Sequence, residues 1–228
     1  ENNMANASTT GFGFYPVMNL GNTPATSGDS KYKIASGLGI AIVQNDPVSL
    51  QNSSGDEGYV QDASPATCDD GSTGGASYDI DASPVASPAL IGVFNGAFYI
   101  ANTTNKPTWA NNVAASTTFA ANPNTDANSN DGFAFVNDNP FQEYMVKADA
   151  AVTIAMTGRR MNPNNNTLAS AKSGQSVATL NIAADNDGYQ WRLLRSAEDP
   201  ENNDVSAVGC NVIVVGSARA NLFTESNK

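Results

Sequence analysis

Short apolar runs separated by turn-forming residues are the feature that most constrains the fold of this chain. No segment longer than about ten residues repeats its apolar residues every 3.6 positions, as an amphipathic helix does. Instead, apolar and polar residues alternate over short segments, and Gly, Pro, Asn and Asp recur between them. This pattern is typical of antiparallel sheets. It predicts a mainly β protein, an antiparallel β-sandwich or barrel with long loops.

The apolar runs give the expected strands directly. The strongest signal is segment 89–101, which is rich in aromatic and β-branched residues. In chain order, strands are expected at 31–34, 40–43, 48–50, 89–101, 133–135, 144–146, 152–156, 177–182, 189–194 and 212–215. Segment 111–118 is a candidate short helix, and segment 51–89, dense in Gly, Ser, Asp and Pro, is expected to be a long loop.

The beginning of the chain has a different character from the rest. Pro16 and Pro24 forbid a continuous helix in residues 1–30, which are otherwise rich in Asn, Gly, Thr and Ser. We therefore expect an extended N-terminal arm that docks its aromatic residues on its own body or on a neighbour. Residues 31–228 are expected to form a single β-rich domain, either undivided or made of two sub-lobes. The candidate interface residues of the arm are Phe12, Phe14, Tyr15, Pro16 and Val17.

Charge and composition exclude several function classes. The chain has 22 acidic and 11 basic residues and a net charge of -11, which disfavours nucleic acid and anionic membrane partners. It contains no His, so Ser-His-Asp or Cys-His catalysis and His-ligated metal sites are excluded within it. No apolar run reaches the roughly 18 residues of a membrane span, and no signal peptide is expected.

Acidic residues occur in pairs but in settings typical of turns. The pairs are Asp69/Asp70, Asp79/Asp81, Asp185/Asp187 and Glu198/Asp199. Most of them stand beside Gly or Pro, where Asp hydrogen-bonds its own backbone. Two oxygen-rich segments, 126–132 and 185–188, resemble calcium loops superficially, but the first has Asn137 where the motif requires Glu. We therefore expect no catalytic residue, no metal and no cofactor. Cys68 and Cys210 are either one disulfide or two separate thiols.

These features favour a protein that works by surface contact. Two rival functions make different predictions. A glycan-binding or receptor-binding module would expose Trp109 or Trp191 on a loop or concave sheet, whereas a structural protein would bury Trp191. A hydrolase would need two carboxylates at catalytic spacing in a cleft.

The order of the segments resembles a family of tailed-bacteriophage capsid decoration, or cement, proteins. The family has a Gly-Phe-x-Pro-Val arm, a Tyr-x-Ile strand, a Gly-Asp-Pro-Val turn, an Ile-x-Gly-Val-Phe-x-Gly-x-x-Tyr strand and a Val-x-Asp-x-Pro turn. The similar segments here are 13–17, 32–34, 45–48, 91–99 and 136–140, followed by 191–194, 198–203 and 211–215. The chain departs from the family at Asn45, which replaces Gly, and in the long loop at 51–89.

The resemblance implies a non-enzymatic structural protein on the outer surface of an icosahedral capsid. Its expected partners are the major capsid protein and other copies of this chain in a homotrimer, with neither nucleic acid nor membrane. The arm residues named above would then be the candidate capsid or subunit interface. The alternative function is a head-fibre or glycan-binding or receptor-binding β module on the virion surface.

Overall fold

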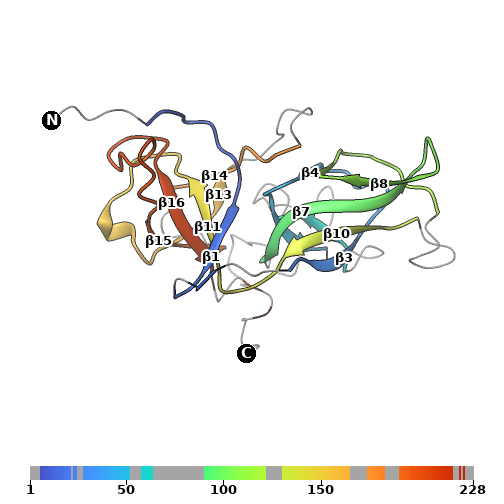
Figure 1. Cartoon of the computed structure of the whole chain (residues 1–228), viewed down its shortest axis with the longest axis horizontal. Coiled ribbons are helices and arrows are strands. Elements are labelled where there is room, and N and C mark those ends of the chain that lie inside the picture. Colours follow the sequence, from blue (N-terminus) through green and yellow to red (C-terminus); the bar gives the residue numbers. More distant parts are fainter. Residues whose placement is uncertain are drawn as a thin grey trace, which may run out of the picture.

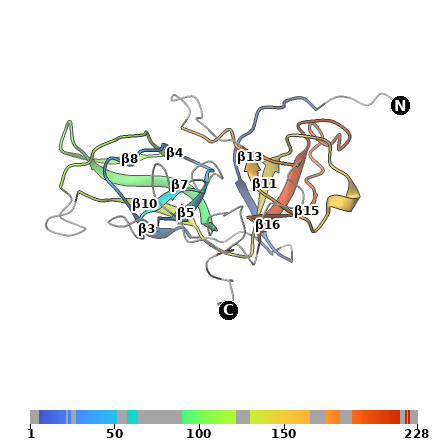
Figure 2. The same ribbon diagram turned by 180° about the vertical axis from the view of Figure 1, so that it is seen from behind.

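The fold consists of two β lobes that lie side by side (Figures 1 and 2). The computed structural model describes residues 6–21, 23–24, 28–51, 58–63, 90–121, 130–164, 174–182, 190–217, 221 and 223. Within these residues the secondary structure is almost entirely antiparallel β, which confirms the predicted mainly β class. No helix among them is long and apolar enough to span a membrane.

The first lobe is built on a six-stranded sheet with the order β12-β15-β16-β11-β1-β2. Its strands are β1 (Tyr15–Asn19), β2 (Thr23–Pro24), β11 (Gln142–Lys147), β12 (Arg160–Met161), β15 (Trp191–Ser196) and β16 (Asn211–Gly216). A small sheet of β13 (Pro163–Asn164) and β14 (Thr179–Leu180) joins it. The sheet therefore combines the first strand of the chain with its last strands.

The second lobe is built on the other six-stranded sheet, with the order β3-β10-β7-β5-β6, and β8 pairs with β7. Its strands are β3 (Ser30–Ile34), β5 (Pro47–Leu50), β6 (Val60–Asp62), β7 (Leu90–Ala101), β8 (Lys106–Ala110) and β10 (Gly132–Asn137). A small sheet of β4 (Ile42–Val43) and β9 (Asn112–Val113) covers it. The long strand β7 pairs with β5 through its first half and with β8 through its second half.

Two local predictions are wrong. The alternating segment 152–156, expected as a strand, contains a 3-10 helix, η2 (Ile154–Met156), and Ile154 is 93% exposed. Residues 111–118, a candidate helix, contain β9 and a turn in which Ser116 has a φ of 60°. The positive φ interrupts any helix there.

Each lobe has its own apolar core. Trp191 is fully buried in the core of the first lobe, where it stacks on Phe14 at 4.2 Å between ring centroids and meets Tyr144 edge-on at 5.3 Å. The core of the second lobe gathers around Phe94 and Phe119. Trp191 is buried, as expected for a structural protein, whereas Trp109 is 71% exposed, as expected for a glycan-binding or receptor-binding module. The two tryptophans therefore do not decide between these functions.

The two lobes meet at a hydrogen-bonded junction formed by Gln44–Asp46. Gln44 exchanges backbone hydrogen bonds with the segment 174–176, and Asn45 binds both the backbone N–H of Phe14 and the carbonyl of Phe94. Asn45 adopts a φ of 72°, the left-handed region that Gly and Asn enter most readily.

The N-terminal arm is not a separate element. Tyr15–Asn19 is an interior strand of the first sheet, paired with β11 on one side and with β2 on the other. Phe14 is 0% exposed and belongs to the core of the lobe. Phe14 therefore docks on the chain's own body, one of the two outcomes that the sequence left open, whereas Tyr15 is 52% exposed.

Candidate functional site

An aromatic surface covers the outer side of the sheet in the second lobe. Strand alternation turns Ala97 and Ala134 into the core, and their neighbours along β7 and β10 point outward. Trp109 of β8 lies directly opposite Phe98 of β7 in the strand register and so shares that side. We call Phe98, Trp109, Phe133 and Phe135 the outer aromatic face.

The rings of the outer aromatic face contact one another closely. Trp109 stacks on Phe135 at 5.3 Å with an interplanar angle of 21°, and its ring centroid is 4.8 Å from that of Phe98. Lys31 places its Nζ 4.1 Å above the ring of Phe133. Trp109 is nevertheless 71% exposed, and its indole N–H meets no acceptor among the described residues. A large apolar ring with a free donor is thus presented to solvent.

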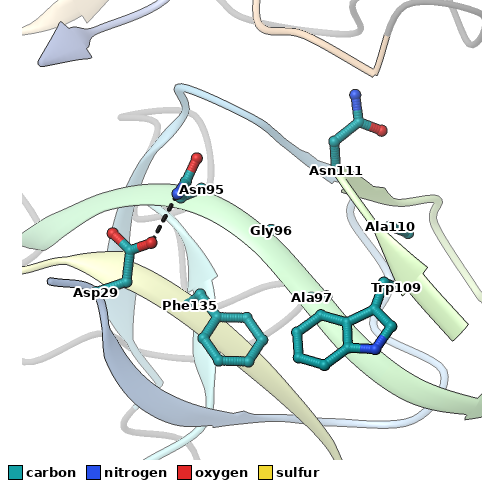
Figure 3. A pocket seen from close by; sticks show the side chains of 8 residues that line it. All are labelled: Asp29, Asn95, Gly96, Ala97, Trp109, Ala110, Asn111 and Phe135. Atoms are coloured by element: carbon teal, nitrogen blue, oxygen red, sulfur yellow. Dashed lines mark hydrogen bonds between the residues drawn. The ribbon is translucent and has the colours of Figure 1, made fainter. Parts of the chain in front are cut away.

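A cavity of about 440 Å³ opens beside these rings (Figure 3). It has room because Gly96, which lies opposite Phe135 in the strand register, carries no side chain. The Asp29 and Asn95 side chains stand on one side of it, and Trp109 and Asn111 stand on the other. Its volume falls in the range of roughly 300–1,000 Å³ typical of small-molecule sites.

The polar side of the cavity is held in place by hydrogen bonds. Asn95 Nδ2 donates to Asp29 Oδ2 at 2.6 Å, and Gln44 Nε2 donates to Asn95 Oδ1 at 2.9 Å. Asn95 is the extra residue of a β-bulge, because Phe135 pairs with Gly96 while Val136 pairs with Phe94. Bulges redirect side chains and are common beside functional sites. Here the bulge turns an amide toward the cavity.

A second cavity of about 130 Å³ adjoins the first and shares Asp29 and Asn95 with it. Pro16 of β1 and Asn45 also line it, so this cavity lies at the boundary between the lobes. The Asp29–Asn95 pair therefore lines both cavities: the larger one beside the aromatic rings and the smaller one at the boundary between the lobes. An extended ligand could contact both.

The five candidate interface residues of the N-terminal segment fall into different environments. The structure corrects the assignment of Phe14, because a fully buried ring cannot contact a partner. Phe12 is half-buried, with Lys147 Nζ 5.8 Å from its ring centroid, and Pro16 and Val17 are also half-buried. Tyr15 is 52% exposed, so its side chain can contact a partner.

Several of the described acidic residues have structural partners. Asp199 accepts hydrogen bonds from Asn202, Asn211 and the backbone N–H of Glu201, and these bonds lower the pKa of its carboxyl group. Asp131, in the segment that superficially resembles a calcium loop, pairs with Lys33 at 3.2 Å. No group of three metal-ligating acidic or Cys residues occurs within the described ranges.

Several sequence candidates lie outside the described residues. They are Cys68, Asp69, Asp70, Asp79, Asp81, Asp126, Asn128, Asp185, Asp187 and most of the loop 51–89. Cys210, the other cysteine, is buried as a free thiol 3.9 Å from Ser196 Oγ. Burial raises the pKa of this thiol, which keeps it protonated and unreactive at neutral pH.

Asp46 is the most perturbed carboxyl group of the junction. Its side chain is buried, and burial raises its pKa to about 7, although the backbone N–H of Val43 donates to Oδ2 at 2.9 Å. The group lies outside both cavities. We assign it to the packing of the junction rather than to catalysis.

Comparisons with known proteins identify no relative of this chain. No family model matches the chain, and no curated protein and no solved structure is significantly similar to it.

Proposed function

We propose that this chain is a structural protein of a virion, which decorates the outer surface of an icosahedral phage capsid. In this proposal it bridges neighbouring subunits of the major capsid protein, associates as a homotrimer and catalyses no reaction. The first lobe makes the contacts with the capsid.

The observation that carries the proposal is a set of exposed apolar side chains on the first lobe. They are Tyr15, Leu20, Phe141, Ile154, Val205 and Val208. Leu20 and Phe141 are neighbours, because the backbone N–H of Leu20 donates to the carbonyl of Phe141 at 2.8 Å. Val205 lies beside the segment that carries Ile154, because the N–H of Val152 donates to its carbonyl at 2.8 Å.

Leu20 and Phe141 thus form one pair of neighbours, and Val205 and Ile154 lie on neighbouring loops. Exposed apolar groups of this kind mark contact surfaces. Two such surfaces on one lobe suit a protein that touches two neighbours in a lattice. Multiple weak contacts would then add through effective concentration.

The resembling motifs support the choice of partner. The segment 45–48 begins in the junction between the lobes, and Asn45, at the position of the family's Gly, has a φ of 72°, a conformation that Gly and Asn adopt most readily. The motif segments 32–34, 91–99 and 136–140 contribute to the sheet beside that junction. The motifs thus coincide with positions that determine the fold.

Co-sedimentation with capsids tests this proposal. Purified chain is mixed with shells of its parent phage that lack the decoration protein. We expect saturable binding with a fixed number of chains per shell. A variant combining Leu20→Ser with Phe141→Ser should bind at least roughly ten-fold more weakly.

The matched control is Ile40→Ser, which removes a similarly exposed apolar residue from the second lobe. It should bind shells like the wild type. Failure of the wild type to sediment with shells would refute the proposal. Sedimentation velocity of the free chain tests the trimer separately.

A further inference from the structure

We propose that the cavity beside Trp109 is a binding site for neutral oligosaccharides. This inference goes beyond capsid decoration and does not depend on it, because the residues that line the cavity of about 440 Å³ all belong to the second lobe. Its core is the stacked pair of Trp109 and Phe135, and its polar side is the Asp29–Asn95 pair.

The first step of the argument is the shape and chemistry of the apolar side. The C–H groups on one face of a pyranose ring form a flat apolar surface, whereas the hydroxyl groups project from the edge of the ring. Trp109 offers a flat apolar surface of matching size that is 71% exposed and backed by Phe135 and Phe98. A sugar placed on it would bury apolar area without losing hydrogen bonds at its edge.

The second step concerns the polar groups around the cavity. Sugar hydroxyls need both donors and acceptors, and amide and carboxylate side chains supply them in a fixed geometry. Gln44 and Asp29 hold the Asn95 amide in one orientation, which leaves an N–H of Asn95 and the second Asp29 oxygen for a ligand. The site is therefore preorganised, which reduces the entropic cost of binding.

The third step of the argument compares a neutral sugar with other classes of ligand. A chain with a net charge of -11 repels phosphate groups, so nucleic acid is disfavoured despite the exposed rings. A flat protein surface would cover Trp109 but leave the cavity of about 440 Å³ empty. A neutral sugar fills the cavity, and the adjoining cavity of about 130 Å³ extends the site for a second unit.

Affinity electrophoresis with soluble neutral polysaccharides tests the proposal. The full chain is run on native gels that contain a glucan, a mannan, a galactan or a xylan. We expect at least one polymer to retard the wild type, and the matching hexasaccharide then serves for calorimetric titration. Trp109→Ala should weaken binding at least roughly ten-fold, which is about 1.4 kcal/mol. Trp109→Phe should retain part of it.

A measurement on the wild type makes the test independent of any variant. Trp191 is fully buried, so acrylamide should quench mainly the exposed Trp109. The hexasaccharide should protect this fluorescence from quenching. Asn95→Ala should weaken binding while the stacked rings stay in place, and Phe141→Ala, on the other lobe, should have no effect.

Three results would overturn the proposal. The first is retardation by none of the four polymers. The second is binding that survives Trp109→Ala unchanged. The third is a change in the sedimentation coefficient of the free chain in Trp109→Ala, which would show that another copy of the chain occupies the outer aromatic face. Binding of Trp109→Ala to capsids should equal that of the wild type, which separates this proposal from the decoration function.

Discussion

Phe14 and Tyr15 are adjacent in sequence but face opposite environments. Phe14 is 0% exposed and stacks on Trp191, whereas Tyr15 is 52% exposed. Phe14→Ala removes a ring from a packed core and should lower the free energy of unfolding by about 3–5 kcal/mol. Tyr15→Ala should change it by less than about 1 kcal/mol. Urea denaturation of both variants measures the difference, and similar losses would contradict the assignment of Phe14 to the core.

Asp46 should give the stability of the protein an unusual dependence on pH. Its pKa is about 7 in the folded chain and 3.8 in a model peptide, so the folded state binds the proton more tightly between these values. Stability should therefore fall as the pH rises from about 4 to 7, by on the order of 4 kcal/mol at most. Asp46→Asn should flatten this part of the profile in urea titrations at several pH values. An unchanged slope would show that Asp46 ionises in the folded state at its ordinary pKa.

Strand β7 contains two glycines that differ in how much space a Cβ atom would have. A Cβ at Gly92 would lie 2.1 Å from the carbonyl oxygen of Asn137, a backbone atom that cannot move aside. A Cβ at Gly96 would lie 3.2 Å from the carbonyl oxygen of Ala110, a contact that a small shift relieves. Gly92→Ala should therefore lower the free energy of unfolding by about 1–3 kcal/mol or more.

Gly96→Ala should cost much less stability, but it places a methyl group at the edge of the cavity beside Trp109 and should weaken sugar binding. Thermal unfolding and the calorimetric titration together check this pair. Equal stability losses at the two positions would contradict the close approach of β7 to Asn137.

The strands with one polar and one apolar side, or with long apolar runs, could be predicted from the sequence. Strands β7, β10, β15 and β16 were expected close to their observed bounds. Segment 152–156 has the same alternation but pairs with no strand in the described part of the chain, and it contains η2, which leaves Ile154 exposed. Alternation describes which side a residue takes in a sheet, but it does not show that a partner strand exists.

The candidate site could not be predicted for a related reason. In β10, Phe133 and Phe135 alternate with Ala134 and Val136, so both sides of the strand are apolar and the pattern does not identify the buried one. Trp109 joins the outer aromatic face only because β8 pairs with β7. Asp29 and Asn95 are 66 residues apart in sequence and meet only in the folded lobe.

At the scale of the whole molecule, the two lobes are joined by more than a linker. Leu90 and Val93 start β7 in the second lobe but pack into the core of the first. Gln44 binds the segment 174–176 through backbone hydrogen bonds in both directions. Unfolding one lobe would therefore expose buried groups of the other, and we expect a single cooperative transition.

Each lobe contains one tryptophan, which makes this expectation testable. In Trp109→Phe the remaining fluorescence comes from Trp191, which reports on the first lobe, whereas far-ultraviolet circular dichroism reports on the sheets of both lobes. The two signals should change at the same urea concentration. Separate midpoints would mean that the junction does not couple the lobes.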